Sequence, residues 1–170
     1  MGQACVLLVL AGCRTNSSSS AIVNLKRSAQ SLVDEIKRSR TPIYVADAKT
    51  YVSLYPPERI DEAKAVYDPR LLPGMASGVV ALHQRCTHLG CRVPFCLTSQ
   101  WFECPCHKSL YNLAGEQRGG PAPRGLDHFP ITVGQDGTVS IDTSVAIPGP
   151  PPGTDTTAQP PAGPHCVQGL

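Results

Sequence analysis

Residues 86–111 read CTHLGCRVPFCLTSQWFECPCHKSLY and hold five of the eight cysteines and two of the five histidines of this 170-residue chain. Cys86 and His88 form a Cys-x-His motif in the first half, and Cys104 and His107 form a Cys-x-x-His motif in the second half. Thiolates and imidazoles are preferred ligands of soft and borderline transition metals. Two of each at spacings typical of loops make a complete ligand set for a metal centre.

Each half of this stretch also carries one spare thiol. Cys91 follows Cys86 within the first loop, and Cys106 lies between Cys104 and His107 in the second. A zinc site with two cysteine and two histidine ligands would leave both spare thiols unexplained. A structural zinc, or a set of scattered disulfides in a secreted domain, is the alternative interpretation. Neither requires this order of ligands with one extra cysteine in each loop.

The stretch resembles the Rieske iron-sulfur proteins. The motifs C-T-H-L-G-C at residues 86–91 and C-P-C-H-x-S-x-Y at residues 104–111 match the two cluster-binding loops of that family position by position. The resemblance implies a 2Fe-2S cluster with one iron held by two cysteines and the other by two histidines. The implied ligands are Cys86 and Cys104 for the first iron, and His88 and His107 for the second.

Further residues around the cluster follow from the same resemblance. Cys91 and Cys106 are expected to form a disulfide that joins the two loops. Residues 119–123 match the proline-rich loop that covers the cluster on one side, which places Gly120 and Pro121 beside it. Glycine allows close approach of the backbone there, and proline supplies stiffness.

Ser109 and Tyr111 match two hydroxyl donors found in the quinol-oxidising members of the family. In those members the hydroxyls bond a bridging sulfide and the sulfur of the first cysteine ligand. On position alone, Tyr111 is equally typical of a half-buried strand aromatic and Ser109 of a turn residue. The complete second motif favours the hydroxyl-donor interpretation.

The resemblance implies an all-β fold, a Rieske-type antiparallel β-sandwich with a cluster-binding subdomain. Runs rich in Tyr and Val predict strands, and the spacing of turn residues predicts a hairpin. The expected strands cover residues 43–46, 50–54, 78–83 and 100–103, the hairpin covers 129–133 and 138–142, and a short helix is expected within 58–67. We expect the Rieske domain at residues 41–145, with its cluster-binding part at about residues 82–124.

Segments of a different character are expected on either side of this domain. Apolar residues recur at helical spacing over residues 21–40, which predicts an amphipathic N-terminal helix that stops before Pro42. Residues 146–170 are rich in proline and polar residues and predict an extended tail with almost nothing to bury.

The first twenty residues predict a membrane attachment. The apolar run at residues 4–11 is shorter than the roughly 20 residues that span a bilayer. It ends in residues 10–13, LAGC, which resemble a bacterial lipobox, so lipidation of Cys13 is expected, with residues 17–20 as a tether. Residues 1–12 contain no Lys or Arg, whereas an export signal normally begins with positive charge. The alternative is therefore the end of a longer transmembrane anchor.

The cysteine count indicates an oxidising compartment, because eight cysteines are many for a reducing one. If Cys5 is removed with the signal and Cys13 is lipidated, Cys96 and Cys166 remain as the unassigned pair. A second disulfide between them would attach the tail to the cluster-binding end. Both interpretations of the N-terminus place the domain on the extracytoplasmic side of a bacterial cell membrane.

Other function classes find little support in the sequence. A net charge of +2 with 16% charged residues gives no basic stripe, so no nucleic-acid partner is expected. There is no glycine-rich phosphate loop and no nucleophile elbow. His83 is expected to be a strand residue, and His128 and His165 have no partner at metal-binding spacing.

The implied ligand set predicts the chemistry. Neutral imidazoles in place of two thiolates raise the reduction potential far above that of an all-cysteine cluster. The second nitrogen of each imidazole can carry a proton, and reduction nearby raises its proton affinity. Such coupling suits oxidation of a quinol, with His88 and His107 contacting it. Ligation without substrate contact, as in Rieske ferredoxins, is the alternative role.

The resemblance therefore implies the iron-sulfur subunit of a quinol:cytochrome c (or plastocyanin) oxidoreductase of the cytochrome bc type. Its expected partners are a cytochrome b subunit, a c-type cytochrome and quinol, and the subunit alone would have no complete activity. The alternatives are the Rieske small subunit of an arsenite-oxidase-like enzyme, a free-standing Rieske electron carrier, and a zinc-stabilised binding protein.

Overall fold

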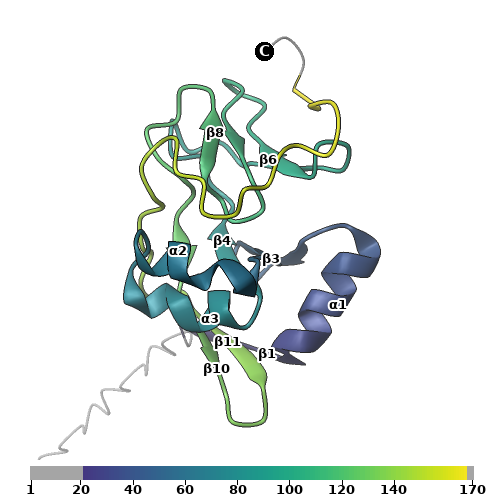
Figure 1. Cartoon of the computed structure of the whole chain (residues 1–170), viewed down its shortest axis with the longest axis vertical. Coiled ribbons are helices and arrows are strands. Elements are labelled where there is room, and N and C mark those ends of the chain that lie inside the picture. The colour runs from purple at the N-terminus through teal and green to yellow at the C-terminus, as the bar shows by residue number, and fades with distance from the viewer. Residues whose placement is uncertain (1–20, 168–170) are drawn as a thin grey trace, which may run out of the picture.

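The computed structural model describes residues 21–167, which form three antiparallel sheets with few and short helices (Figure 1). The all-β fold class expected from the sequence is confirmed. The proposed lipidation site Cys13 and the rest of residues 1–20 lie outside the described residues. None of the helices among residues 21–167 is both long enough and apolar enough to cross a bilayer.

Two of the sheets form the base of the molecule. The first has the strand order β1-β11-β10, and the second has the order β2-β3-β4-β9. The strands of the first are β1 (Ile22–Ser28), β10 (Ile131–Val133) and β11 (Thr138–Asp142). The strands of the second are β2 (Ile43–Val45), β3 (Thr50–Leu54), β4 (Val79–His83) and β9 (His128–Phe129). These bounds confirm the expected strands and hairpin to within one or two residues.

The third sheet forms the opposite end of the molecule and carries the two motif loops (Figure 1). Its strand order follows the sequence, so each strand pairs with the next one along the chain. The strands are β5 (Phe95–Cys96), β6 (Trp101–Glu103), β7 (Leu110–Tyr111) and β8 (Gln117–Gly119). Because such neighbours are joined by short loops, this end is a local unit inserted between β4 and β9.

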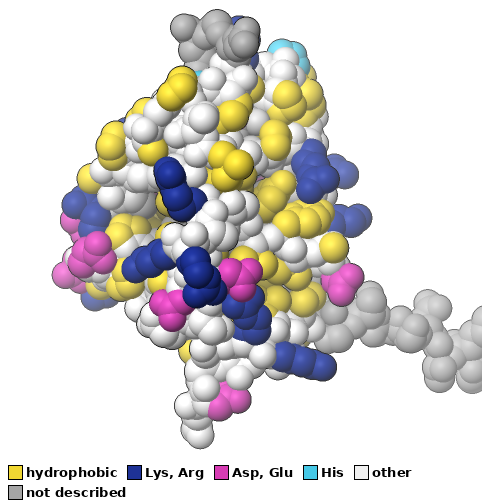
Figure 2. Space-filling model, turned by 90° about the vertical axis from the view of Figure 1, so that its right-hand side faces the viewer, with side chains coloured by type: hydrophobic (Ala, Val, Ile, Leu, Met, Phe, Trp, Pro, Cys, Tyr) yellow, Lys and Arg dark blue, Asp and Glu magenta, His cyan; other side chains and the backbone are white. Residues whose placement is uncertain are grey.

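Short helices cover the base. The helix α1 (Ala29–Ser39) follows β1, and the remaining helices lie between β3 and β4. These are η1 (Pro57–Arg59), α2 (Ile60–Lys64), η2 (Pro69–Leu71) and α3 (Leu72–Ala76). On α1 the apolar face, with Leu32, Val33 and Ile36, packs against Val52 and Ala81 of β3 and β4. Figure 2 shows its outer face, where Lys and Arg side chains lie beside Asp and Glu.

The expectation of one helix over residues 21–40, placed ahead of the β domain, was wrong in its first part. Ile22–Ser28 is a strand that pairs with β11, and the helix begins only at Ala29. Ser28 caps it, because its hydroxyl accepts a hydrogen bond from the Ser31 amide. The apolar residues of 22–25 fit both the period of a helix and the alternation of a strand. Pairing with a distant strand decides between the two structures.

The C-terminal segment also differs from expectation. Residues 146–167 form no named strand, as an extended tail should, but they pack along the molecule beside the third sheet (Figure 1). We call this segment the strap. Ile147 is buried and exchanges two backbone hydrogen bonds with His128, and the buried Thr156 donates to Glu116. Polar contacts hold the strap, so its low apolar content did not predict its packing.

Candidate metal centre

Two loops with the same backbone arrangement present the motif residues. In the first, the Cys86 amide donates to the Cys91 carbonyl at 2.8 Å, and the Gly90 amide donates to the Cys86 carbonyl at 2.9 Å. In the second, the Cys104 amide donates to the Ser109 carbonyl at 2.8 Å, and the Lys108 amide donates back to the Cys104 carbonyl at 3.0 Å. Gly90 and Lys108 both have positive φ, at 80° and 59°. Each loop is therefore a closed turn with a cysteine at its start.

The thiols of Cys86 and Cys104 point into the protein. They are 3% and 1% exposed, and they are the free cysteines of residues 21–167. Burial tends to raise the pKa of the Cys86 thiol, but hydrogen bonds led by that from Tyr111 outweigh it and lower the pKa. Burial and the neighbouring Cys86 raise the pKa of the Cys104 thiol. The two thiols face one another in a position to share one partner.

The imidazole rings of His88 and His107 lie beside each other at the surface of this end. Their centroids are 4.8 Å apart and the rings are nearly perpendicular. The Nδ1 atom of His88 is buried and has no hydrogen-bond partner among the described residues. A buried nitrogen without a hydrogen-bond partner lowers the stability of the fold. Its lone pair is therefore available to a metal ion.

The disulfide between Cys91 and Cys106 joins the two loops. A second disulfide joins Cys96, beside the first loop, to Cys166 in the strap. The structure thus forms both pairs expected from the sequence, and the four cysteines of these pairs are unavailable as metal-binding thiolates. Only Cys86 and Cys104 remain for that role within the described chain.

The hydroxyls of Tyr111 and Ser109 lie next to the thiols. The Tyr111 oxygen is 3.1 Å from the Cys86 sulfur, and burial followed by the contact with Cys86 raises the pKa of the phenol. Ser109 also interacts with Cys86, and its oxygen accepts a hydrogen bond from the Ala122 amide at 3.1 Å. Both hydroxyls are fully buried.

A third loop, carrying Gly120 and Pro121, packs against the second motif loop. Gly120 has a φ of 79°, and a Cβ atom there would lie 2.5 Å from the Lys108 carbonyl oxygen. No other residue type fits, because both the backbone angle and the space exclude a side chain. Pro121 is exposed, whereas the adjacent Ala122 is buried against the loop with Ser109.

The chemistry of this donor set fits a Rieske cluster. Two buried thiols, two adjacent imidazoles and one unpartnered nitrogen match the two-cysteine, two-histidine ligation of such a centre. Buried hydroxyls next to the thiols supply hydrogen bonds to sulfur. No acidic side chain is needed to complete the set.

Comparison with known proteins agrees with this geometry. A model of the Rieske [2Fe-2S] domain family matches residues 43–130. The chain belongs to this family. Membership confirms the resemblance and means that the chain carries a Rieske-type 2Fe-2S cluster.

The sequence relatives are iron-sulfur subunits of cytochrome b6-f complexes. The chloroplastic subunit of Volvox carteri is 42% identical over 79 residues, which are 45% of this chain and 38% of the relative. The subunit of Synechococcus sp. (strain JA-2-3B'a(2-13)) is 46% identical over 63 residues, or 35% of this chain and 37% of the relative. The chain thus spans less than half the length of these relatives.

Among solved structures, the plasma membrane Rieske protein PetC3 from Synechocystis PCC 6803 is similar. Its TM-score is 0.45 at 19% identity, with 70% of this chain and 97% of that chain covered. The soluble domain of the Rieske protein II (soxF) from Sulfolobus acidocaldarius has the same score and identity, covering 77% of this chain and 84% of that one.

Sequence reasoning missed two buried carboxylates. Glu103, next to Cys104, accepts hydrogen bonds from Ser99 at 2.6 Å and the Val167 amide at 2.9 Å, and it pairs with His165 at 2.8 Å. These contacts outweigh burial and lower its pKa. No local sequence signal marks it, since two of its partners, His165 and Val167, lie in the strap.

Glu116 is the second buried carboxylate. It accepts hydrogen bonds from Tyr67 at 3.0 Å, from Asn112 at 2.6 Å and from Thr156 of the strap at 2.5 Å. Glu116 therefore joins the base, the third sheet and the strap. Its role is structural, because it has no contact with the four motif residues.

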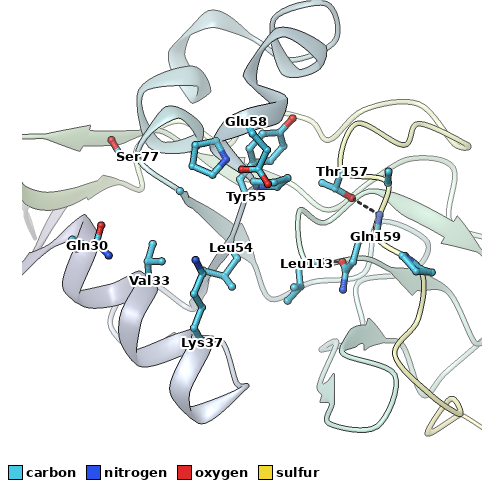
Figure 3. A pocket seen from close by; sticks show the side chains of 15 residues that line it. Gln30, Val33, Lys37, Leu54, Tyr55, Glu58, Ser77, Leu113, Thr157 and Gln159 are labelled. Atoms are coloured by element: carbon cyan, nitrogen blue, oxygen red, sulfur yellow. Dashed lines mark hydrogen bonds between the residues drawn. The ribbon is translucent and has the colours of Figure 1, made fainter.

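A cavity of about 560 Å³ lies away from the motif loops, between α1 and the strap (Figure 3). Leu54, Tyr55 and Glu58 line it from the base, and Leu113, Thr157 and Gln159 line it from the other side. None of the motif cysteines or histidines faces it. This cavity is therefore not part of the candidate metal centre.

Proposed function

We propose that this chain is the iron-sulfur subunit of a quinol:cytochrome c (or plastocyanin) oxidoreductase of the cytochrome bc type. In this proposal Cys86 and Cys104 hold one iron, and His88 and His107 hold the other. The observation that carries it is the pair of imidazole rings 4.8 Å apart, with two buried thiols beneath the same loops. Contact with a quinol requires accessible ligands, and the His107 ring is exposed.

The cluster, when bound, supplies a one-electron acceptor of high potential. His107 is exposed and His88 is half-buried with its Nδ1 turned inward. Each histidine can therefore hold a proton on its outer ring nitrogen, next to a substrate that must lose protons as it loses electrons. His88 and His107 are the residues we propose to contact the quinol hydroxyl.

Tyr111 and Ser109 are proposed to set the potential. A hydrogen bond to a sulfur ligand stabilises the more negative reduced state more than the oxidised state. The contact of 3.1 Å between the Tyr111 oxygen and the Cys86 sulfur supports this role directly. Gly120 and Pro121 hold the third loop over the centre.

The partners are proposed from the relatives, which are subunits of cytochrome b6-f complexes. The subunit would take an electron from quinol at a cytochrome b subunit and pass it to a c-type cytochrome or plastocyanin. We propose that it is attached to a cell membrane through residues 1–20, with Cys13 as the lipidation site, and faces the extracytoplasmic side. Two disulfides support an oxidising compartment.

The test is electron paramagnetic resonance of the reduced protein in membranes, with and without inhibitors of quinol oxidation. A Rieske spectrum that changes when quinone-site inhibitors bind is the expected result. A zinc protein would contain no iron or sulfide. A Rieske spectrum indifferent to every quinone-site ligand would contradict the quinol-oxidising role and leave the cluster assignment intact.

A further inference from the structure

The side chain of Glu103 places a buried carboxylate directly next to a proposed cluster ligand. Glu103 ends β6 and precedes Cys104, and its side chain is 1% exposed. The Ser99 hydroxyl donates to its Oε1 at 2.6 Å, the Val167 amide donates to its Oε2 at 2.9 Å, and the His165 Nδ1 lies 2.8 Å from Oε1. Burial alone would raise the pKa of Glu103, but these hydrogen bonds outweigh burial and lower the pKa. The buried side chain is therefore an anion at neutral pH.

The third sheet fixes this anion relative to the second motif loop. Glu103 pairs with Leu110 of β7, and one residue further on the Cys104 amide donates to the Ser109 carbonyl at 2.8 Å. Glu103 and Leu110 are thus the pair of strand residues that flank the loop of residues 104–109. The backbone of Glu103 cannot move without moving Cys104.

The strap holds the carboxylate in place and keeps water from it. Two of its three partners, His165 and Val167, belong to the strap. The residue between them, Cys166, forms the disulfide with Cys96 of β5. The centroid of the His165 ring also lies 5.5 Å from that of Trp101 on β6. Release of the strap would remove both partners and open the carboxylate to solvent.

A fixed negative charge in the interior lowers the reduction potential of a nearby redox centre. Reduction adds one electron, and a neighbouring anion disfavours the more negative state. Water and salt screen a buried charge much less than an exposed one. The charge of Glu103 should therefore oppose the hydroxyls of Tyr111 and Ser109, which favour the reduced state.

We propose that Glu103 sets the reduction potential of the cluster together with these hydroxyls, by means of a negative charge that the strap keeps buried. The proposal rests on the proposed function for the role of Cys104 as a ligand. Glu103 acts through its charge and its position, because both of its oxygens are already bonded within the protein. By lowering the potential, Glu103 makes the reduced subunit a better donor to the acceptor that follows it.

The first experiment removes the charge with almost no change in shape. The reduction potential of the full, cluster-loaded chain is measured by protein-film voltammetry at about pH 7, where an imidazole of ordinary pKa is mostly neutral. In Glu103→Gln we expect the equilibrium constant for reduction to rise by about tenfold, which is about 59 mV for one electron. Glu103→Asp keeps the charge, so its potential should stay close to that of the wild type.

The matched control is Glu116→Gln, the same change at the other buried carboxylate. The Glu116 carbonyl accepts from the Asn112 amide at 3.1 Å, which places Glu116 further along the sheet from Ser109 than Glu103 is. Its equilibrium constant for reduction should change by about threefold at most, because coulombic effects weaken with distance. Equal changes in Glu103→Gln and Glu116→Gln would overturn the proposal.

The contribution of the strap is tested with a double-mutant cycle. Cys96→Ser with Cys166→Ser keeps Glu103 but removes the bond that holds its two strap partners. Water should then screen the carboxylate, so the potential should rise by less than in Glu103→Gln. In a chain that already carries Glu103→Gln, the serine pair should cause no further rise. Fully additive changes would show that the strap does not act through Glu103, which would overturn its part in the proposal.

Cluster content separates failure of this proposal from failure of the proposed function. A wild-type chain without iron and sulfide would contradict both. A loaded Glu103→Gln chain with the wild-type paramagnetic spectrum and an unchanged or lower potential would overturn this proposal alone. If Glu103→Gln assembles no cluster, the strap variant decides, and an unchanged potential in that variant would overturn the proposal.

Discussion

Two regions of this molecule, the motif loops and the strap, contain similar residues but differ in whether the polar atoms of those residues have partners. At the motif loops, the Cys91–Cys106 disulfide lies beside the imidazoles of His88 and His107. At the strap, the Cys96–Cys166 disulfide lies beside His165, which pairs with Glu103 at 2.8 Å. Each corner thus combines a disulfide, a histidine and a buried polar group.

The strap corner is internally complete, because Glu103 also binds Ser99 and the Val167 amide. The motif corner is incomplete, because the Nδ1 atom of His88 has no partner among residues 21–167 and two buried thiols stay free. The motif corner therefore differs from a structural disulfide site by combining an unpartnered imidazole nitrogen with free, buried thiols.

The largest expected effect separates the two corners by cluster content. Cys86→Ser should abolish cluster assembly, since one of two thiolate ligands is lost, so iron and sulfide should fall to background. The control, Cys96→Ser with Cys166→Ser, should retain two irons and two sulfides per chain. A Cys86→Ser protein with a full cluster and an unchanged spectrum would contradict the ligand assignment.

The second prediction concerns stability. The Cys96–Cys166 bond closes a loop with a sequence separation of 70, against 15 for Cys91–Cys106. In the chain-entropy model these bonds contribute about 4 and about 3 kcal/mol respectively. Replacing the strap pair by serine should therefore lower the free energy of unfolding more, as measured by urea denaturation of the cluster-free protein. The reverse order would show that the strap is held mainly by its polar contacts.

His128 provides a third case that sharpens the comparison. Its Nδ1 is buried and, like that of His88, has no hydrogen-bond partner in the described part of the chain. Its Nε2 lies 2.9 Å from the Ala114 carbonyl, and its ring packs on Tyr67. No thiol faces it, so it is a structural residue rather than a ligand. Burial lowers its pKa to about 4.

The pH dependence follows from this shift. Below pH 6.5, His128 of the unfolded chain binds a proton, whereas the buried His128 of the folded chain stays neutral down to about pH 4. The free energy of unfolding therefore decreases as the pH falls from 6.5 to about 4. The loss amounts to roughly 3 kcal/mol at one pKa unit per 1.36 kcal/mol. His128→Gln should flatten the unfolding free energy over this window. An equally steep slope in the variant would assign the dependence to other groups.

The smallest effect concerns the hydroxyls beside the thiols. A hydrogen bond to a charged group is worth about 1.5 to 3 kcal/mol, and about half of that separates the redox states. At about 59 mV per 1.4 kcal/mol, Tyr111→Phe and Ser109→Ala should each lower the reduction potential by roughly 30 to 60 mV. Protein-film voltammetry measures this, and the spectrum should show an intact cluster. If neither potential falls, the hydroxyls do not bond the cluster.

The sequence predicted the motif corner far better than the strap corner. The motif is recognisable from the spacing of four residues close together in the sequence, Cys86, His88, Cys104 and His107. The family, the cofactor and the strands around the motif could therefore be predicted from the sequence. Glu116 and Thr156 are forty positions apart and meet at 2.5 Å only in the folded chain. Nothing in the residues around either position indicates that contact.

The start of the domain was mispredicted for a related reason. Residues 22–25 carry an apolar pattern compatible with a helix, and β11 makes them a strand by supplying a partner more than a hundred residues away. The periodicity of a short sequence segment contains no information about such long-range pairing. The Cys96–Cys166 disulfide was predictable only because few cysteines were left over, which is an argument from counting rather than from structure.

The pairing of β1 with β11 sets an order of assembly during synthesis. Ile22 lies opposite Asp142, and the Thr143 amide donates to the Ala21 carbonyl, so the first sheet closes only after residue 143 has left the ribosome. The third sheet pairs neighbours in sequence and is complete by residue 119. Contacts of short separation form early and those of long separation late. The strand pairs of the third sheet can therefore form before β11, the partner of β1, has been synthesised.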